Sequence, residues 1–179
     1  MSKQNKLLGK TGLTDKSLGI NDIILKIAKD RKQVIYGARS IQKQAKFMAR
    51  DTSDWDIFDK TPKKTSNILQ KKLDKLVGFD HFYSKPAEHE GTWKVKGRGN
   101  DGIKNTADDE SIADYTKPTE KVRFVVKDGI RYRVLKEELK RKIAVSKDPE
   151  FKFRQAKDKD DIKRIKGFIK IRNIVGGSV

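Results

Sequence analysis

At 179 residues, with 35% hydrophobic and 38% charged residues, the chain is expected to form one soluble globular domain with a hydrophobic core. It contains no cysteine and only two histidines, which excludes disulfide bonds and thiolate chemistry and makes a histidine-based zinc site unexpected. The formal net charge of +18 argues for a polyanionic partner, although a lysine-rich or ribosome-like structural protein would have the same composition.

The first 19 residues are polar, basic and glycine-bearing, and we interpret them as a loosely ordered arm before a single domain at 20–179. The arm contains Gly-Lys-Thr at residues 9–11, which is the end of a phosphate-binding loop. That loop also requires a glycine five residues before Gly9 and a buried strand before it, and the chain has neither. No apolar run approaches the roughly 18 residues of a membrane span, and no signal peptide is visible, so a cytoplasmic protein without membrane contact is expected.

From residue 21 onward, predicted helices and strands alternate. Asn21 is a suitable N-cap for a helix to about Arg31, and the apolar residues 34–36 predict a short strand that ends at Gly37. The patterns that follow predict a helix at 38–50, a strand at 54–58, and an amphipathic helix at 65–77 that ends at Gly78. This β-α-β order would place the two strands side by side in one sheet.

The second half of the chain predicts short strands followed by two closing helices. The strands are expected at 81–83, 92–95, 111–116, 122–126 and 130–134, and the helices at 135–145 and 149–174. A Lys-Asp-Gly turn joins the last two strands, and residues 97–110 are expected to form a mobile loop. The predicted fold class is therefore α+β, with helices packed on a mixed sheet.

Two aspartates lie one residue apart in the predicted strand at 54–58. Side chains at positions i and i+2 of a strand point to the same face, so Asp54 and Asp56 should lie together, while Trp55 and Ile57 point the other way. Adjacent carboxylates repel each other unless a cation lies between them, and that cation is usually a divalent metal ion. Two surface aspartates on a solvated strand edge would give the same pattern.

Two further features favour a metal site that works with a nucleotide. The helix after Gly37 begins with free backbone N–H groups and the positive end of its dipole, which suit a phosphate chain. Asp114 is an isolated acid in an otherwise uncharged strand, where a lone carboxylate requires a reason. Together they describe a triphosphate beside three carboxylates that hold two Mg²⁺ ions, one on the phosphates and one that activates an attacking hydroxyl.

These segments resemble a known superfamily. Tyr-Gly-Ala-Arg-Ser at 36–40, Ser-Asp-Trp-Asp-Ile-Phe at 53–58 and Ser-Ile-Ala-Asp-Tyr-Thr at 111–116 are similar to the nucleotidyltransferases typified by DNA polymerase beta, kanamycin nucleotidyltransferase, CCA-adding enzymes and abortive-infection transferase toxins. That pattern is a glycine followed by glycine or serine, a short helix, an aspartate-x-aspartate or glutamate strand, and a third acid on a later strand. The match covers about residues 34–114 and implies the minimal nucleotidyltransferase fold.

The resemblance implies that Asp54 and Asp56 hold both metal ions, Mg²⁺ or alternatively Mn²⁺. Asp114 would help to bind the catalytic ion and could take the proton from the acceptor hydroxyl. The reaction implied is the transfer of a nucleoside monophosphate from a nucleoside triphosphate such as ATP to a hydroxyl group.

The resemblance also implies which residues contact the nucleotide. Gly37 and Ser40 would contact its phosphates, together with the neighbouring Ala38 and Arg39. Ala38 stands where the superfamily has glycine or serine, so it offers a backbone N–H but no hydroxyl.

Near the C-terminus, the segment from Phe153 to Ile165 is similar to a late helix of several minimal members. Arg154 and Lys157 would be phosphate contacts by this likeness. The alternative is that these side chains form surface ion pairs with Asp158 and Asp161 at helical spacing.

The distribution of charge favours a nucleic-acid acceptor. Residues 1–50 hold 12 basic and 3 acidic side chains, residues 51–114 hold 11 and 13, and residues 115–179 hold 20 and 9, so basic flanks surround a locally acidic centre. RNA, such as a tRNA 3′ end, is favoured over DNA as the acceptor. A non-catalytic nucleic-acid-binding protein on the same fold, and a transferase that modifies a protein, are the alternatives.

Some other residues have two interpretations. Trp93, Phe124 and Tyr132 could stack on nucleic-acid bases, but aromatic residues in strands more often belong to the core. The acids at 108–110 lie in the expected loop and are predicted to be solvated.

Overall fold

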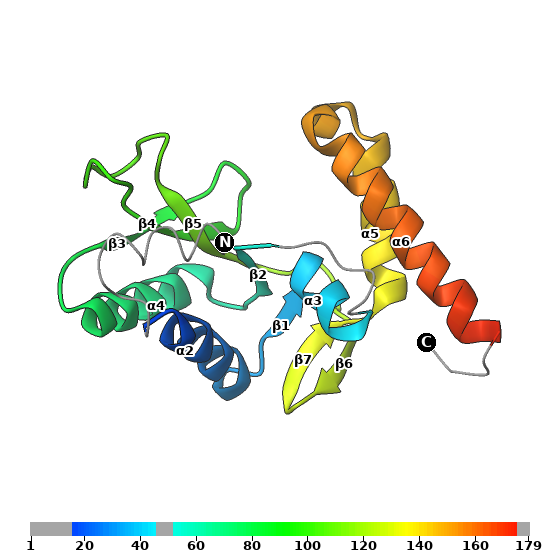
Figure 1. The fold of residues 1–179 in the computed structure, drawn as a ribbon, viewed down its shortest axis with the longest axis horizontal. Helices are drawn as coiled ribbons and strands as arrows, with labels where there is room; N and C mark the ends of the chain where they lie inside the picture. The colour runs from blue at the N-terminus through cyan, green and yellow to red at the C-terminus, as the bar shows by residue number, and fades with distance from the viewer. Residues whose placement is uncertain (1–15, 46–51, 175–179) are drawn as a thin grey trace.

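The computed structural model describes residues 16–45 and 52–174 (Figure 1), and within these ranges it has five α-helices and a seven-stranded sheet, which confirms the α+β class. The helices are α2 (Lys16–Asp30), α3 (Gly37–Gln44), α4 (Pro62–Val77), α5 (Leu135–Lys147) and α6 (Gln155–Ile174), with a 3₁₀ helix at Pro149–Arg154. The strands are β1 (Val34–Tyr36), β2 (Trp55–Phe58), β3 (Phe82–Pro86), β4 (Thr92–Gly97), β5 (Glu110–Thr116), β6 (Phe124–Lys127) and β7 (Ile130–Arg133).

All seven strands form one mixed sheet in the order β3-β4-β5-β2-β1-β7-β6. Strand β1 pairs antiparallel with β2 and parallel with β7, and β2 pairs parallel with β5 on its other side. The prediction that the first two strands lie side by side in one sheet is thereby confirmed. The strand that carries Asp114 is the other neighbour of β2, so the three resembling segments meet at the centre of the sheet.

Helices α2 and α4 cover one face of the sheet and build the main core with it. Ile24 of α2, together with Leu69 and Leu73 of α4, is fully buried against this face. In β2, Trp55 and Ile57 point into this core, whereas Asp56 and Phe58 are only partly buried. The alternation predicted for this strand is therefore confirmed, and the opposite side is the acid-bearing face.

A second, smaller core joins α3 to the C-terminal helices α5 and α6, which lie side by side and away from α2 and α4 (Figure 1). Within it, the buried ammonium of Lys142 lies 3.1 Å from Asp158 and 2.7 Å from Asp161. Burying three charged groups costs several kcal/mol per ion unless they are paired, and here each carboxylate contacts the same ammonium. Helices α5 and α6 are therefore held together by side-chain ion pairs as well as by apolar contacts.

Helix α2 begins at Lys16, five residues before the predicted N-cap. Asn21 is inside the helix, and its Oδ1 accepts a hydrogen bond of 3.1 Å from the indole N–H of Trp55. Residues 16–19 are therefore helical and not part of an arm, and residues 1–15 lie outside the described ranges. The polar residue that resembled a cap instead orients the tryptophan beside the two aspartates.

Other boundaries differ by a few residues. Helix α3 ends at Gln44, and residues 46–51 of the predicted helix lie outside the described ranges. Helix α4 begins at Pro62 because proline is pre-organised for the first helical position, and it ends at Gly78 in the left-handed conformation (φ +89°), as predicted. In the described part of the chain, no helix combines the length and apolarity needed to cross a membrane.

The loop between β4 and β5 is held together by its own carboxylates. Asp109 accepts N–H bonds from Gly99 (3.0 Å) and Thr106 (3.1 Å), and Asp108 accepts one from Asn100 (2.6 Å). Asp108 is exposed, as expected, whereas Asp109 is half-buried. These acids stabilise the loop in which they lie, and the site described below is built without them.

Candidate active site

The sheet register brings the predicted acids together. Asp56 of β2 is paired directly with Asp114 of β5 and, on the other side, with Tyr36 of β1. Residues paired across neighbouring strands share a face, so the two carboxylates project to the same side. Asp54 precedes β2 by one residue and is two positions from Asp56 on this face. Asp56 and Asp114 are therefore neighbours on the acid-bearing face, and Asp54 is near enough for its charge to act on Asp56.

The electrostatics of this cluster are unfavourable without a cation. Burial, together with the charges of Asp54 and Asp114, raises the pKa of Asp56 to about 6. Burial also raises the pKa of Asp114, although the ammonium of Lys94 opposes this at 3.3 Å from its Oδ2. The cluster thus favours either protonation or the arrival of positive charge.

The side chains as they stand do not enclose an ion. Among residues 16–45 and 52–174, no three carboxylate or histidine side chains are gathered closely enough to hold a metal. Thr52 Oγ1 donates to Asp54 (2.6 Å), and Lys94 lies against Asp114. The donor set nevertheless fits Mg²⁺, because carboxylate oxygens are its preferred protein ligands and a cation would offset the repulsion between Asp54, Asp56 and Asp114. Binding would need the three side chains to turn towards one point.

Gly37 lies directly against this cluster. It is the first residue of α3 and has φ +68°, a conformation that side-chain-bearing residues rarely adopt. A Cβ atom at this position would lie 2.2 Å from Oδ2 of Asp56. Glycine is therefore required both by the backbone turn and by the space that the Asp56 carboxylate occupies.

A buried glutamate from α5 occupies the N-terminus of α3. The N–H of Gly37 donates a 2.9 Å hydrogen bond to Oε1 of Glu138, which is fully buried, and burial raises the pKa of this carboxyl. Oε2 of Glu138 lies 3.9 Å from Nε of Arg141, longer than a hydrogen bond. The N–H of Gly37 that was predicted to contact a phosphate therefore already has a partner. A phosphate would have to displace the Glu138 carboxylate to reach it.

Three residues around the acids were not predicted from the sequence: Glu138, Arg141 and Lys94. One signal was present for Glu138, because Leu135, Glu138, Leu139 and Lys142 follow the i, i+3, i+4, i+7 spacing of an inward-facing helix stripe. Charged residues at apolar-stripe positions require buried partners, and both have them here.

The other residues of the predicted phosphate turn have structural contacts. Ser40 is fully buried, and its hydroxyl donates to the backbone carbonyl of Arg133 (2.7 Å), so it anchors α3 to β7 and is not available to a phosphate. Ala38 is also buried. The guanidinium of Arg39 lies 4.5 Å from the centre of the Trp55 ring and bonds the carbonyl of Asp54 at 3.4 Å. Arg39 therefore positions the chain segment that carries Asp54.

The two C-terminal candidates lie in the 3₁₀ helix Pro149–Arg154 and in α6. The side chain of Arg154 lies outside the described residues, and Lys157 is exposed on α6. Asp158 and Asp161, the alternative partners, instead bind the buried Lys142 of α5. Of the aromatic candidates, Tyr132 belongs to the main core, as the alternative interpretation predicted.

The raised pKa of Asp56 predicts a pH dependence of folding stability. Because the pKa rises from its ordinary value of 3.8 to about 6 on folding, the folded state holds this proton more tightly. The resulting stability is fully present below about pH 4 and is lost as the pH rises to about 6. In chelator, the melting temperature of Asp56→Asn should therefore exceed that of the wild type by a margin that grows from pH 4 to 6 and is constant above. A margin independent of pH would contradict this.

Comparisons with known proteins agree with the fold. No protein-family model matches the sequence, and a search of curated proteins found no match. The Megavirus polyadenylate synthase has a similar structure, with a TM-score of 0.65, 20% identity, and coverage of 84% of this chain and 31% of that chain. JHP933 from Helicobacter pylori gives a TM-score of 0.53 and 12% identity over 90% of this chain and 66% of that one. The nucleotidyltransferase fold is thereby confirmed, and the chain spans under two thirds of either structure's length.

Proposed function

We propose that this protein is a magnesium-dependent nucleotidyltransferase that moves a nucleoside monophosphate from a nucleoside triphosphate to a hydroxyl at an RNA 3′ end. The observation that carries the proposal is the direct pairing of Asp56 with Asp114 on one face of the sheet, with Asp54 beside them. Asp56 and Asp114 have raised pKa values, and Asp56 lies against the turn at Gly37. This arrangement is costly for the fold and therefore requires a functional reason.

Asp54 and Asp56 would hold the metal, and Asp114 would complete its ligands. Bound Mg²⁺ or Mn²⁺ would neutralise triphosphate charge and lower the pKa of the acceptor hydroxyl. In the transfer, the acceptor oxygen forms a bond to the α-phosphorus of the nucleotide. The bond from that phosphorus to the pyrophosphate oxygen breaks, and pyrophosphate leaves with the electron pair. Asp114 receives the hydroxyl proton, a role that its raised pKa suits.

The cations around the acids would bind the triphosphate. Lys94 lies against Asp114 and can exchange this carboxylate for a phosphate once a metal neutralises the acids. Arg141 lies 5.1 Å from the Tyr36 ring, close enough to lower the pKa of Asp56 by its charge. The buried Nε–H of Arg141 has no hydrogen-bond acceptor, so it can donate to a phosphate oxygen.

Two observations support RNA as the acceptor. The chain carries a net charge of +18, and one of its structural neighbours is a polyadenylate synthase. Because this chain spans 31% of that neighbour, the shared substrate class is part of the proposal.

The test is incubation of the full chain with each labelled nucleoside triphosphate, Mg²⁺, and single-stranded RNA, DNA or a protein mixture. Label should enter RNA, one product should be pyrophosphate, and chelator should stop the reaction. Label in the protein pool would assign the transferase to a protein acceptor. No label in any pool, with RNA binding retained, would favour the non-catalytic nucleic-acid-binding alternative.

A further inference from the structure

We infer that the protein holds the upstream part of a single-stranded RNA acceptor in a basic groove at the end of the sheet, away from the acids. This groove, called the sheet-end groove, consists of two adjoining hollows of about 760 and 610 Å³ that share Lys60 and Thr61 in the β2–α4 connection. The inference rests on the proposed function, because it assigns a binding surface to the acceptor of that reaction.

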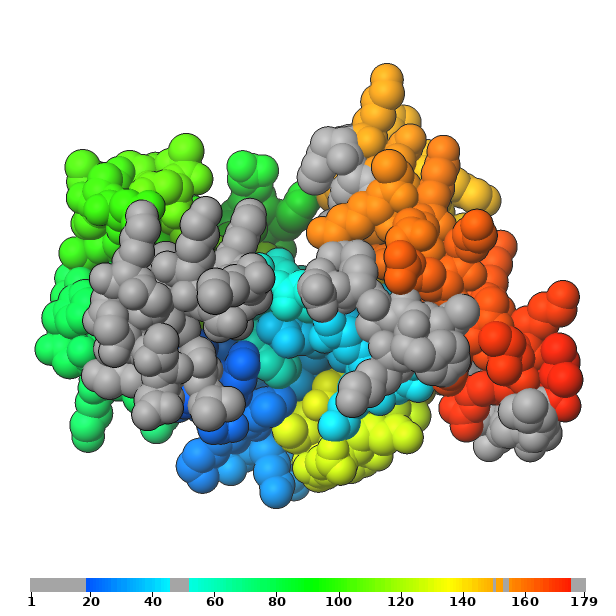
Figure 2. Space-filling model, viewed as in Figure 1, coloured from blue at the N-terminus to red at the C-terminus, as the bar shows by residue number. Residues whose placement is uncertain are grey.

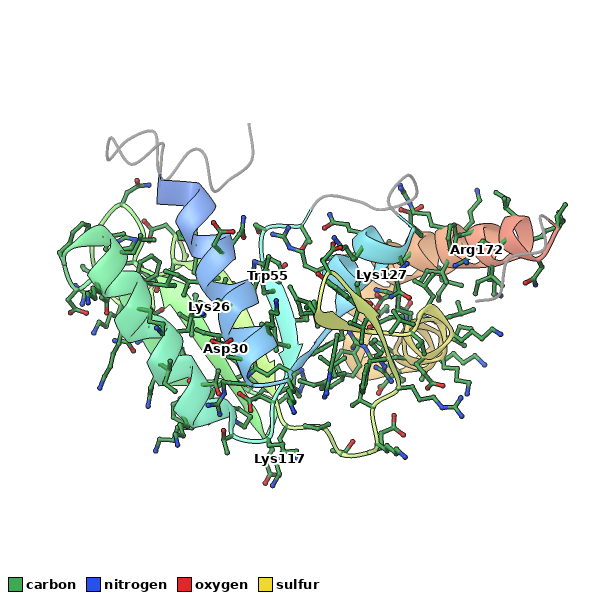
Figure 3. All side chains as sticks on the ribbon, turned by 90° about the horizontal axis from the view of Figure 1, so that it is seen from below. Lys26, Asp30, Trp55, Lys117, Lys127 and Arg172 are labelled. Atoms are coloured by element: carbon green, nitrogen blue, oxygen red, sulfur yellow. The ribbon has the colours of Figure 1, made fainter. Side chains whose placement is uncertain are left out.

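The groove lies where an acceptor strand would pass. Strands β2 and β5 run parallel from the acids towards it, and Lys60 and Lys117 follow Asp56 and Asp114 by four and three residues. At about 3.3 Å per residue, the groove begins roughly 10–13 Å from the carboxylates. Figure 3 shows Lys117 at the edge of the protein, with β2 running between it and Trp55. A strand whose 3′ end lies at the acids can therefore continue into the groove.

The lining of the smaller hollow is complementary to phosphates. It contains four lysines, at positions 60, 63, 64 and 117, and none of its lining residues is acidic. Helix α4 begins inside this hollow, has no acid in its first turn, and lacks a side-chain cap on its N-terminus. The positive end of the helix dipole adds to the lysine charge, so the hollow attracts a chain of anions.

Each hollow also presents an aromatic ring with a cation beside it. The ammonium of Lys63 lies 5.2 Å from the Trp93 ring, and the guanidinium of Arg131 lies 4.5 Å from the Phe124 ring. Phe124 is 41% exposed on the edge strand β6, where the core does not require it. Unpaired bases stack on such rings and on arginine planes, whereas bases in a duplex are not accessible to them, so the groove suits a single strand.

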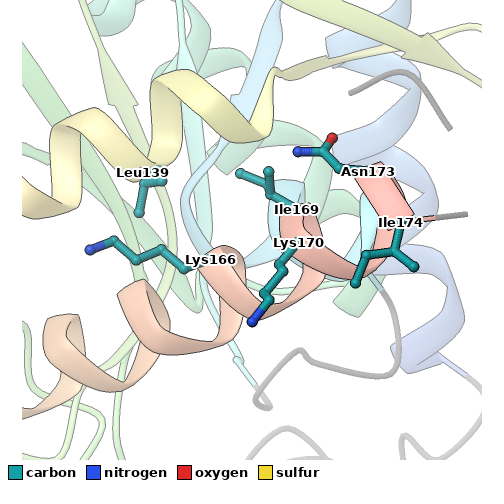
Figure 4. Close-up of a pocket in the computed structure, with 6 residues that line it drawn as sticks. All are labelled: Leu139, Lys166, Ile169, Lys170, Asn173 and Ile174. Carbon is teal, nitrogen blue, oxygen red and sulfur yellow. The ribbon is translucent and has the colours of Figure 1, made fainter. Parts of the chain in front are cut away.

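Another hollow of the protein lacks the combination of clustered cations and aromatic rings that the sheet-end groove has. The space between α5 and α6 (Figure 4) has a volume of about 420 Å³ and is lined by Lys166, Lys170 and largely apolar neighbours such as Ile169 and Ile174. It offers two cations and no aromatic ring, and it receives no residue from the strands that carry the acids. It therefore lacks the features that select a nucleic-acid strand in the sheet-end groove.

The experiment compares two double variants of the same helix. Lys63→Ala with Lys64→Ala removes two charges from the groove, and Lys71→Ala with Lys72→Ala removes two exposed charges two turns further along α4. Alanine in the first turn removes an unfavourable charge–dipole contact, so the groove variant should fold at least as well as the control. Binding is measured by fluorescence anisotropy with a labelled single-stranded RNA of about 12 nucleotides, without triphosphate, at several salt concentrations.

The groove variant is expected to bind at least about tenfold more weakly, and its slope of log affinity against log salt should fall by about 1.4, at roughly 0.7 per lost phosphate contact. The control should retain the wild-type slope. Phe124→Ala should weaken binding several-fold without changing the slope, because stacking releases no counterions. Equal losses in the two lysine variants, or tighter binding of duplex than of single-stranded RNA, would overturn the inference.

Transfer kinetics separate this inference from the proposed function. The groove variant should raise KM for the long acceptor and leave both kcat and the KM for a dinucleotide acceptor unchanged. If the groove variant and the wild type have the same KM for the long RNA acceptor, the groove inference alone is overturned. Groove-dependent RNA binding with no transfer to any acceptor would overturn the proposed function and leave the groove in place.

Discussion

Asp56→Asn should reduce nucleotidyl transfer by on the order of a thousandfold, while the protein remains folded and becomes more stable above pH 6. Asp56 is the central acid. It is paired with Asp114 in the sheet, and burial together with both other carboxylates raises its pKa. An asparagine of the same shape cannot neutralise a metal ion, but it also removes the repulsion. Transfer is measured as labelled product under single-turnover conditions, and stability by thermal unfolding.

Asp22→Asn is the matched control, because Asp22 is exposed on α2 and the change in charge is the same. It should leave transfer unchanged. Asp54→Asn should reduce transfer as Asp56→Asn does, since both aspartates would hold the metal. Transfer near the wild-type rate in Asp56→Asn would remove the carboxylate cluster from the mechanism. A variant that is both inactive and unfolded would show instead that Asp56 supports the fold, contrary to its raised pKa.

The part of the site that could be predicted from the sequence is the part set by local geometry. The two-residue period of a strand separates Asp56 from Trp55 and Ile57, and the structure confirms that separation. The β-α-β order also predicted that the first two strands would be neighbours. Both conclusions need only the period of a strand and a short connection.

The contacts that could not be predicted join residues far apart in the chain. Glu138 reaches Gly37 across 101 positions, and no local pattern states which helix will cover the N-terminus of α3. The pairing of Lys94 with Asp114 depends on the register of β4 against β5, which contains an irregularity at Val95 and Lys96. Neither partner could be assigned before the topology of the sheet was known.

Ser40 shows how tertiary packing overrides a local interpretation. A serine in the first turn of a helix next to a glycine is typical of phosphate sites, and that pattern predicted its role. In the folded chain the residue faces β7, and burial of its hydroxyl requires a hydrogen-bond partner, which the carbonyl of Arg133 supplies. The direction of a side chain around a helix is settled by what packs on that helix, and here α5 and β7 do so.

Gly37→Ala should reduce transfer by about a hundredfold or more while lowering stability only moderately. Alanine at φ +68° is strained by about 1–2 kcal/mol. Its Cβ would also lie 2.2 Å from Oδ2 of Asp56, which must move. That oxygen is at the end of a side chain that can rotate, so the clash is relieved mainly by turning the Asp56 carboxylate away from its present place. The substitution should therefore displace the Asp56 carboxylate, and so reduce transfer, more than it destabilises the fold.

Gly102→Ala separates the effect of backbone strain from the effect of the clash with Asp56. Gly102 has nearly the same conformation, φ +70°, but a Cβ there would meet nothing within 4 Å. This variant should show the backbone strain alone, as a drop in the free energy of unfolding of about 1–2 kcal/mol with transfer at the wild-type rate. Gly37→Ala should show at least the same drop together with the loss of transfer and of Mg²⁺-dependent stabilisation. If both variants lose the same stability and both keep full activity, the contact between Gly37 and Asp56 does not position the carboxylate for catalysis.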